Sequence, residues 1–281
     1  MNVVAVLLLV VSMLSNPSDA LFLNDYGIVI SEAGKIGQMD GRLIVVDNLM
    51  GDKHVLTSTG LIDPRGLTFD YSNNKIIVAD NDSLKMVDPK SGKVTILYGS
   101  SDFPVKPEYL NDVLWDNGII YVTDTKLNKV FKIEDGKISE LVSVKKASGL
   151  AIGNRGELYI ASFADPQGQI YKYKDGQLRI FIKEADLNGT YGLYYDKKRD
   201  FLIASGYWSG KLVLVEPNGK IINKISGKLR HPAGISYDPV NMYIFISDSA
   251  KNSFFIYKLK DNFRNARPTS NEPKGCSVCG K

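Results

Sequence analysis

The chain has 281 residues, of which 44% are hydrophobic and 23% are charged, and its formal net charge is +4. Lysine and arginine are spread along the chain with acidic residues between them, so the sequence offers no basic stripe of the kind that binds nucleic acids. We therefore expect no nucleic-acid partner. The two cysteines stand next to the C-terminus, so no disulfide can cross-link the rest of the chain.

Residues 1–20 have the features of a secretory signal peptide. Residues 3–14 form an apolar run that is too short to span a bilayer, and Ser18-Asp19-Ala20 places small residues where a signal peptidase cleaves. We expect cleavage after Ala20 and a secreted, extracellular protein; an uncleaved anchor is the alternative. No second apolar run is long enough to cross a membrane, so no membrane span is predicted elsewhere.

A short sequence pattern returns roughly every 40 to 45 residues, a period typical of propeller blades. An apolar segment that opens on Gly-Leu or Gly-Ile is followed by a second apolar segment that ends at Asp or Ser, as in residues 64–70 with 77–80. Two further short segments, separated by Asp-Gly, Ser-Gly or Asn-Gly turns, complete each unit. Each unit is therefore predicted to be a four-stranded antiparallel meander.

Six such units fit the sequence, which predicts an all-β fold, a six-bladed β-propeller over residues 21–261. Residues 27–31 and 43–47 copy the second and third strands of a unit that lacks a clear beginning. Because a propeller must seal its first blade to its last, we expect the two chain ends to complete one or both terminal blades. Residues 262–281 are predicted to be a polar tail.

The units resemble two related propeller families. Residues 64–71 with 75–80, and residues 232–238 with 246–249, are similar to NHL repeats. The set of six resembles the gluconolactonase, regucalcin and strictosidine synthase superfamily, and residues 111–114 followed by 118–124 are especially similar to the Asn-Asp strand of that group. The resemblance covers roughly residues 24–260 and implies a propeller.

In the enzymes of that superfamily a divalent cation, usually calcium, is held by Glu, Asn and Asp side chains at the start of innermost strands. The resemblance places these positions at the start of the innermost strands, at Arg65, Asn111, Ser148, Tyr191 and Ala233. Only Asn111 matches, because Ser148 and Tyr191 stand where the enzymes carry Asn and Asp. Calcium needs several converging oxygen ligands, so Asn111 with Asp112 is the candidate metal site and Glu32 is a further candidate ligand.

Two histidines could supply a general base if no metal is bound. His231 lies immediately before Pro232, on a loop that leads into an innermost strand, and is the candidate catalytic residue. The alternative is a polar loop residue packed by the proline. His54 stands on a predicted outer strand, where we expect a surface role. The sequence contains no Gly-x-Ser-x-Gly motif, His-Glu-x-x-His motif or phosphate loop.

The favoured hypothesis is a secreted, non-catalytic propeller that binds a small molecule or an extracellular protein at a mouth of its channel. Aromatic groups and fixed polar donors are common in such sites. An alternative for Tyr191 is that it merely plugs the channel. The residues predicted to contact the ligand are Arg65, Asn111, Ser148, Tyr191, Phe163 and Tyr207.

The rival hypothesis is a calcium-dependent hydrolase of the lactonase or esterase type. It places Asn111 and Asp112 at the metal and uses His231 as the base, so it needs calcium as a cofactor, whereas the binding hypothesis needs none. A third possibility is a matrix protein whose Cys276 and Cys279 link chains.

The cysteines form a Cys-x-x-Cys motif at Cys276 and Cys279. A local disulfide or pairing between chains is expected in an oxidising compartment. A zinc site would need ligands from a second chain, and a redox motif would need βαβ surroundings that are missing here. Asn81 and Asn188 each begin an Asn-x-Ser/Thr sequence on a predicted loop, so the chain is predicted to be a glycoprotein if its source is eukaryotic.

Overall fold

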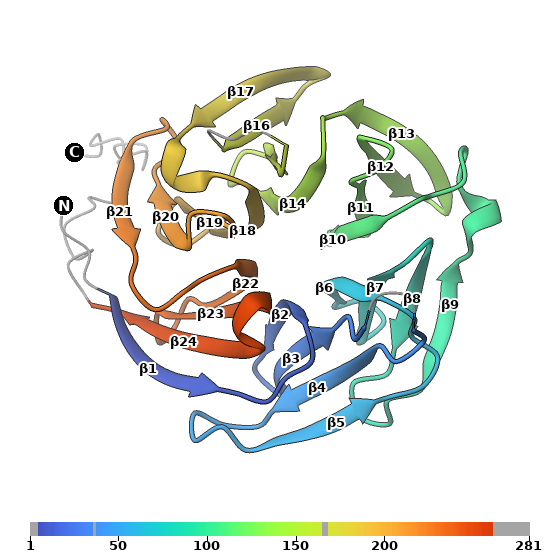
Figure 1. Ribbon diagram of the computed structural model, residues 1–281. Coiled ribbons are helices and arrows are strands. Elements are labelled where there is room, and N and C mark those ends of the chain that lie inside the picture. Colours follow the sequence, from blue (N-terminus) through green and yellow to red (C-terminus); the bar gives the residue numbers. More distant parts are fainter. Residues whose placement is uncertain (1–4, 36–37, 165–167, 261–281) are drawn as a thin grey trace, which may run out of the picture.

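The computed structural model describes residues 5–35, 38–164 and 168–260. They form six four-stranded antiparallel sheets, which are the blades of a ring (Figure 1). The predicted six-bladed β-propeller is confirmed. The helices of the described part are three short 3₁₀ turns: η1 (Ser100–Asp102), η2 (Ala185–Leu187) and η3 (Ser249–Lys251).

In blades 1 to 5 the chain runs outward from the centre of the ring to its rim as a simple meander. The strands of these blades, from centre to rim, are β2 (Pro17–Leu23), β3 (Gly27–Glu32), β4 (Arg42–Val46) and β5 (Lys53–Thr57); β6 (Pro64–Asp70), β7 (Lys75–Asp80), β8 (Ser83–Val87) and β9 (Val94–Tyr98); β10 (Leu110–Asp116), β11 (Ile119–Asp124), β12 (Lys129–Glu134) and β13 (Lys137–Ser143); β14 (Ala147–Ile152), β15 (Leu158–Ser162), β16 (Gln169–Lys174) and β17 (Gln177–Lys183); and β18 (Thr190–Asp196), β19 (Phe201–Gly206), β20 (Lys211–Val215) and β21 (Ile221–Ile225).

Blade 6 is built from both ends of the described chain. Its inner strands are β22 (Pro232–Asp238), β23 (Tyr243–Asp248) and β24 (Ser253–Leu259), and β1 (Ala5–Val11) pairs antiparallel with β24 as the outermost strand. Figure 1 shows this junction as the blue strand beside the red one. The expectation that the two chain ends complete a terminal blade is confirmed.

The segment expected to be a signal peptide lies within this ring. Residues 5–11 form β1, and residues 17–23 form β2, the innermost strand of blade 1, so the ring includes residues before the predicted boundary at residue 21. Cleavage after Ala20 would remove β1 and the beginning of β2. A chain cleaved after Ala20 therefore cannot form the closed ring described here. In the described part, no helix is long and apolar enough to cross a membrane.

The aspartate that ends several second strands has a structural role. Asp80 accepts hydrogen bonds from the backbone N–H groups of Ile62 and Asp63 at 2.6 to 3.1 Å. Asp124 and Asp248 hold the loops that enter β10 and β22 in the same way. Each carboxylate thus fixes the loop that leads into the innermost strand of its own blade, which explains this part of the repeated pattern.

Adjacent blades are joined near the centre of the ring by hydroxyl groups. Four of them stand on second strands and donate to a backbone carbonyl of the next innermost strand at 2.5 to 3.1 Å: Ser31, Thr123, Ser205 and Ser247. Thr68 and Ser148 bridge the other two junctions. Every junction therefore has a directional bond in addition to its apolar contacts.

Apolar side chains fill the space between neighbouring blades. Between blades 5 and 6, for example, Leu214, Tyr237 and Ile246 belong to one continuous cluster and are at most 1% exposed. Full burial of such a side chain contributes roughly 1.5 to 3 kcal/mol. A cluster between blades 6 and 1 includes Val11 from β1 and Leu14, so the first strand contributes to the core as well as to the sheet.

We predict that a chain beginning at Leu21 melts at a markedly lower temperature than the full chain. It lacks β1, so β24 has an open edge, and the core between blades 6 and 1 loses Val11 and Leu14. Thermal unfolding followed by circular dichroism measures the difference. An unchanged melting temperature would show that β1 does not hold the ring together.

A matched pair of substitutions within β1 separates the effect of burial from that of chain length. Val11 is 5% exposed, so Val11→Ser should lower the free energy of unfolding of the protein by about 2 kcal/mol. Leu8→Ser, at a position that is 46% exposed, should change it by less than about 0.5 kcal/mol. Equal effects of the two substitutions in denaturant titrations would contradict the packing of this strand.

Candidate functional site: the central cavity

The pairing register of every innermost strand shifts just after the strand begins. In β6, for example, the shift lies between Pro64 and Leu67, and the other five blades have it at the equivalent place. A bulge of this kind re-aims side chains. It creates two levels of residues around the channel. The first level is Ser18, Arg65, Asn111, Ser148, Tyr191 and Ala233; the second level is Asp19, Gly66, Asp112, Gly149, Gly192 and Gly234.

Four of the six second-level residues are glycines because the innermost strands approach one another closely there. A Cβ atom on Gly66 would lie 2.5 Å from Cα of Asp112, and one on Gly192 would lie 2.4 Å from the carbonyl oxygen of Ala233. A Cβ atom on Gly234 would lie 1.8 Å from a carboxylate oxygen of Asp19. The two second-level aspartates, Asp19 and Asp112, therefore occupy room that neighbouring glycines leave.

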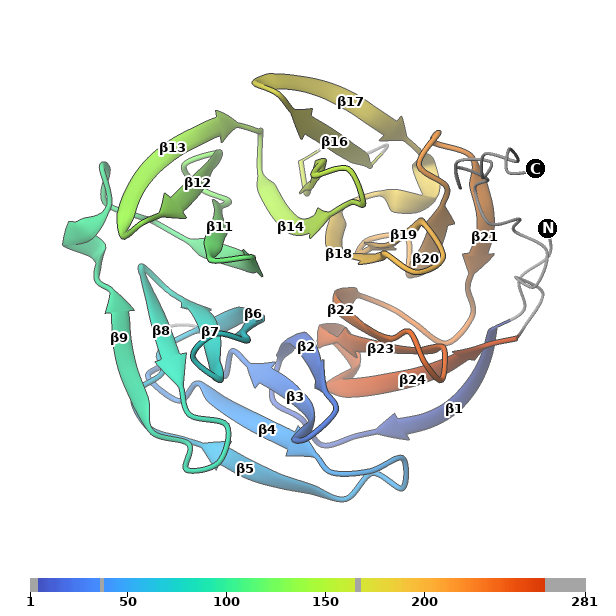
Figure 2. The same cartoon turned by 180° about the vertical axis from the view of Figure 1, so that it is seen from behind.

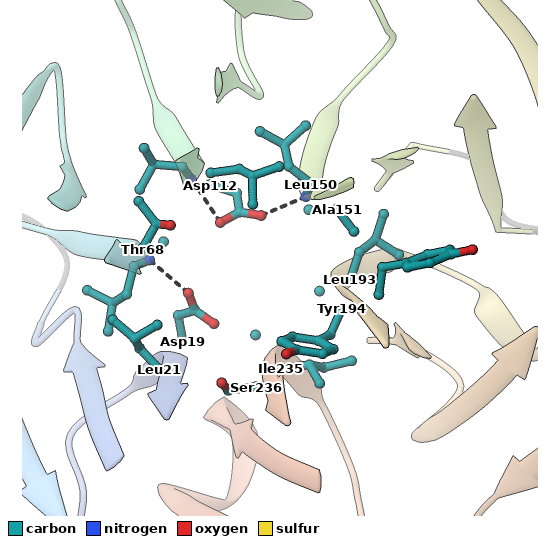
Figure 3. A pocket seen from close by; sticks show the side chains of 18 of the residues that line it. Asp19, Leu21, Thr68, Asp112, Leu150, Ala151, Leu193, Tyr194, Ile235 and Ser236 are labelled. Carbon is teal, nitrogen blue, oxygen red and sulfur yellow. Dashed lines mark hydrogen bonds between the residues drawn. The ribbon is translucent and has the colours of Figure 1, made fainter. Parts of the chain in front are cut away.

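Each of these aspartates bridges two blades through backbone hydrogen bonds. Asp19 accepts from the N–H of Ala20 and from the N–H of Leu67 in blade 2, both at 2.8 Å. Asp112 accepts from the N–H of Val113 at 2.8 Å and from the N–H of Leu150 in blade 4 at 2.7 Å. Figure 3 shows both carboxylates pointing into the same cavity.

Both carboxyl groups are harder to ionise than an ordinary aspartate. Burial raises the pKa of Asp19 well above its usual value, and the nearby Asp112 carboxylate raises it further, against the backbone hydrogen bonds that lower it. Burial raises the pKa of Asp112 to about 7. Each group therefore tends to hold its proton, and its ionised form would be stabilised by a cation that entered this poorly solvated space.

The centre of the ring contains a cavity of about 490 Å³, lined by residues of all six innermost strands. In Figure 2, these strands surround the centre of the ring. The cavity reaches the surface at the turns that follow the innermost strands, because Tyr71 is 71% exposed and Val240 is 74% exposed and both line it. Trp115 lies beside Tyr71, with ring centroids 5.8 Å apart. We call this end the aromatic mouth: Tyr71, Trp115, Tyr194 and Val240.

At the opposite end, the side chain of Tyr191 spans the channel. Its hydroxyl lies 3.4 Å from Oγ of Ser18 in blade 1, and it hydrogen-bonds with Arg65 of blade 2. The Arg65 guanidinium pairs with Asp63 at 3.0 Å and lies 4.5 Å from the ring centroid of Tyr109. Contacts from blade 5 to blades 1 and 2 therefore cross this end, as expected if Tyr191 plugs the channel.

Phe163 and Tyr207, two of the predicted ligand contacts, lie in an aromatic cluster beside Tyr191. Their ring centroids are 5.5 Å apart, and Phe163 lies 5.8 Å from Tyr191. His231 stacks on Tyr207 at 4.5 Å and also contacts Trp208. Of the six predicted ligand contacts, the structure thus gathers Arg65, Tyr191, Phe163 and Tyr207 near one end, but they bond and stack with one another.

The candidate metal ligands are engaged with partners within the protein. The amide group of Asn111 donates to the Thr125 hydroxyl at 2.8 Å, and the Ser148 hydroxyl donates to the carbonyl of Thr190 at 2.8 Å. Glu32 is buried against Arg42 and accepts from the N–H of Ser15. In the described part of the chain, no three His, Cys, Asp or Glu side chains converge as metal ligands would. The donor set therefore does not fit the calcium site that the resemblance implies.

His231 does not line the cavity that contains Asp112. Its ring lies in the aromatic cluster, and its backbone N–H donates to Asp248 at 3.1 Å. His54 lies 3.0 Å from Asp47 on the outermost strand of blade 1, with its side chain 56% exposed. Neither histidine therefore lines the cavity that contains Asn111 and Asp112.

The remaining candidate sites lie away from the cavity. Asn81 stands between β7 and β8, with its side chain 3.5 Å from Asp82, and Asn188 follows η2. Both are on loops, as glycosylation requires, and their glycosylation stays a prediction. Cys276 and Cys279, and the predicted tail of residues 262–281, lie outside the described residues.

The sequence analysis missed Asp19 as a site residue because it fell inside the expected signal peptide. One signal was available. Ser18-Asp19-Ala20-Leu21 aligns with Asn111-Asp112-Val113-Leu114 as the same stretch of an innermost strand, and like it lacks the glycine by which the other four units are recognised. Asp112 was identified, but as a metal ligand.

No protein-family model matches the sequence, and no curated protein matches it. Several solved structures, however, are similar to the chain. The chain is similar to a gluconolactonase from Xanthomonas campestris (15% identity, TM-score 0.73, covering 91% of this chain and 89% of the other). It is also similar to a luciferin-regenerating enzyme (10% identity, TM-score 0.68, covering 90% of this chain and 95% of the other). A third similar structure is a chain of a nidogen–laminin complex (16% identity, TM-score 0.65, covering 85% of this chain and 87% of the other).

These similarities confirm the expected resemblance at the level of the fold. The similar structures include a gluconolactonase and other proteins that share the six-bladed ring. At identities of 10 to 16%, they carry no information on which of these activities, if any, this chain has.

We predict that the stability of the protein falls as pH rises from about 4 to about 7. Because the folded-state pKa values of Asp19 and Asp112 lie above that of an unfolded aspartate, the folded state binds more protons in this window, and ionisation costs stability. The slope approaches about −1.4 kcal/mol per pH unit for each group. Denaturant titrations across the window measure it.

The control for this prediction is an identical substitution outside the cavity. Asp112→Asn should flatten the pH dependence, whereas Asp135→Asn, in the exposed turn between β12 and β13, should leave it unchanged. Stability that rises through the window in the unmodified protein would contradict the pKa shifts.

Proposed function

We propose that this chain is a non-catalytic binding protein that takes a small, largely apolar molecule into its central cavity through the aromatic mouth. The observation that carries the proposal is the cavity itself, which has a volume of about 490 Å³ and is open beside Tyr71 and Val240. Sites for small molecules are typically concave and mostly apolar, with a few polar groups, and occupy roughly 300 to 1,000 Å³.

The lining of the cavity agrees with this class of ligand. Leu21, Leu114 and Tyr194 supply apolar and aromatic surface, and Asp19 and Asp112 supply fixed acceptors (Figure 3). Because both carboxylates are held by backbone N–H groups, they would keep their positions when a ligand binds, which lowers the entropic cost of binding.

The proposal moves the ligand from the end of the channel favoured by the sequence to the opposite end. Arg65 and Tyr191 interact with each other and with their neighbours, so their polar groups are engaged without a ligand. The aromatic mouth gives access to a cavity of about 490 Å³. Asn111 and Tyr191 line that cavity at its inner end.

Secretion is part of the proposal only with an intact N-terminus, because residues 5–23 build two strands of the ring. A small molecule is favoured over an extracellular protein because the described surface contains a deep cavity. The propeller chain of the nidogen–laminin complex shares this fold, so a protein partner at a flat face would need a different surface from the one described here.

To test the proposal, we would titrate the protein with 2-(4-bromophenyl)ethanol, a small neutral aromatic molecule whose bromine quenches tryptophan on contact. The chain has two tryptophans, Trp115 at the aromatic mouth and Trp208 in the aromatic cluster. Trp208→Phe leaves Trp115 as the sole reporter, and Trp115→Phe leaves Trp208. We expect saturable quenching of Trp115 and only weak, linear quenching of Trp208.

Two results would count against the proposal. Saturable quenching of Trp208 alone would place the ligand at the aromatic cluster, near the residues selected from the sequence. Linear quenching of both reporters would mean that the cavity does not accept a neutral aromatic molecule of this size.

The rival function is a calcium-dependent hydrolase, which we test because the chain shares its fold with a gluconolactonase. We predict that millimolar calcium shifts the melting temperature by less than about 1 °C, since the candidate ligands do not converge. Asn111→Ala should not alter this response. A larger shift that disappears in Asn111→Ala would favour the hydrolase.

A further inference from the structure

The two carboxylates that line the cavity have no cationic partner among the described residues. Asp19 is 8% exposed and Asp112 is partly buried, and each accepts two backbone hydrogen bonds. None of the ion pairs among the described residues includes either of them. A carboxylate has about four acceptor sites, so each retains the capacity to accept from a ligand.

The other charged groups of the cavity stand at its opening. Lys197 and Lys198 are the only cations among its described lining residues, and both are exposed to solvent. Lys197 lies 3.0 Å from Asp116, so its charge is already paired. Asp196, also in the lining, is paired with Arg199 at 3.0 Å. Neither carboxyl group of the inner half of the cavity is therefore paired with one of these cations, so their negative charge is uncompensated when they ionise.

Ionising two carboxyl groups in one poorly solvated cavity is unfavourable unless a positive charge joins them. The other four blades have glycine at the same level, so the fold itself does not need a carboxylate there. The aspartates could still be explained by the two blade junctions that they bridge. Backbone bonding alone, however, does not account for two carboxylates that converge on one open space rather than facing away from it.

The groups that line the cavity favour an organic cation over a metal ion. A calcium ion takes six to eight oxygen ligands at short distance, and two carboxylates in a cavity of about 490 Å³ cannot supply them. An organic ammonium group needs only a few acceptors and carries an apolar body. Tyr71, Trp115 and Tyr194 provide aromatic surface for such a body between the carboxylates and the solvent.

We propose that the ligand of the cavity is an organic amine, bound as its ammonium ion, with the nitrogen against Asp19 and Asp112 and the apolar part directed toward the aromatic mouth. This inference rests on the proposed function, since it names the class of molecule that the same cavity takes. It adds a specificity that the cavity volume alone does not give, namely discrimination between an amine and a neutral molecule of the same shape.

The test compares 2-(4-bromophenyl)ethylamine with 2-(4-bromophenyl)ethanol, which differ in the ammonium group alone. Calorimetry at about pH 8, where Asp112 is largely ionised and the amine protonated, measures both dissociation constants. We expect the amine to bind at least about tenfold more tightly, as hydrogen bonds between charged groups do. Trp115 quenching checks that both molecules occupy the cavity.

Substitutions then assign the preference to the two carboxylates. Asp19→Asn and Asp112→Asn should each reduce the ratio of alcohol to amine dissociation constants toward 1, chiefly by weakening the amine. Asp135→Asn, the same change in an exposed turn, should leave the ratio unchanged. Circular dichroism confirms that each variant is folded, and alcohol binding that persists in the variants shows an intact cavity even where amine binding is lost.

The outcomes separate the two proposals. Equal affinity for amine and alcohol would overturn the amine inference and leave the binding function standing. A preference for the amine that survives both substitutions would also overturn it, because the charge recognised would lie elsewhere. Failure of both molecules to bind would overturn the proposed function and the inference with it.

Discussion

The structure depends on how closely the six innermost strands can approach one another. At the second level of the channel, a Cβ atom on Gly66 or Gly192 would collide with the backbone of the adjacent innermost strand, so the ring can be this narrow only with glycine there. Hydroxyl groups such as those of Thr123 and Ser205 then tie each strand to the next. The diameter of the channel, and with it the size of the cavity, follows from these contacts.

Asp19 and Asp112 are the two second-level residues that are not glycine, and they give the cavity its carboxyl groups. Asp19 and Asp112 stand in blades 1 and 3, so blade 2 lies between them, and each forms hydrogen bonds to the blade that follows it. The same side chains therefore hold the ring and line its hollow centre. A residue with both duties is difficult to replace, since changing its charge also removes an acceptor from a blade junction.

Much of the fold could be predicted from the sequence because each blade repeats a local pattern. The Asp that ends the second strand and the Asp-Gly turns depend on contacts within one blade, and Asp80 illustrates this with its bonds to Ile62 and Asp63. The glycine of the Gly-Leu segment recurs because innermost strands approach their neighbours closely at that level. The site could not be predicted in the same way. Which end of the channel is open depends on the side chain of Tyr191, which reaches from blade 5 to Ser18 in blade 1.

The N-terminal strands β1 and β2 could not be predicted from the sequence for a related reason. An apolar run such as residues 5–11 suits a signal peptide and a buried strand equally well, and only pairing with β24 distinguishes the two. That pairing has a consequence for biosynthesis. β1 is made long before β24, so it must wait for that strand, and the pairing joins residues about as far apart along the chain as any in the ring. Until then blade 6 has only three strands and β24 has an open edge.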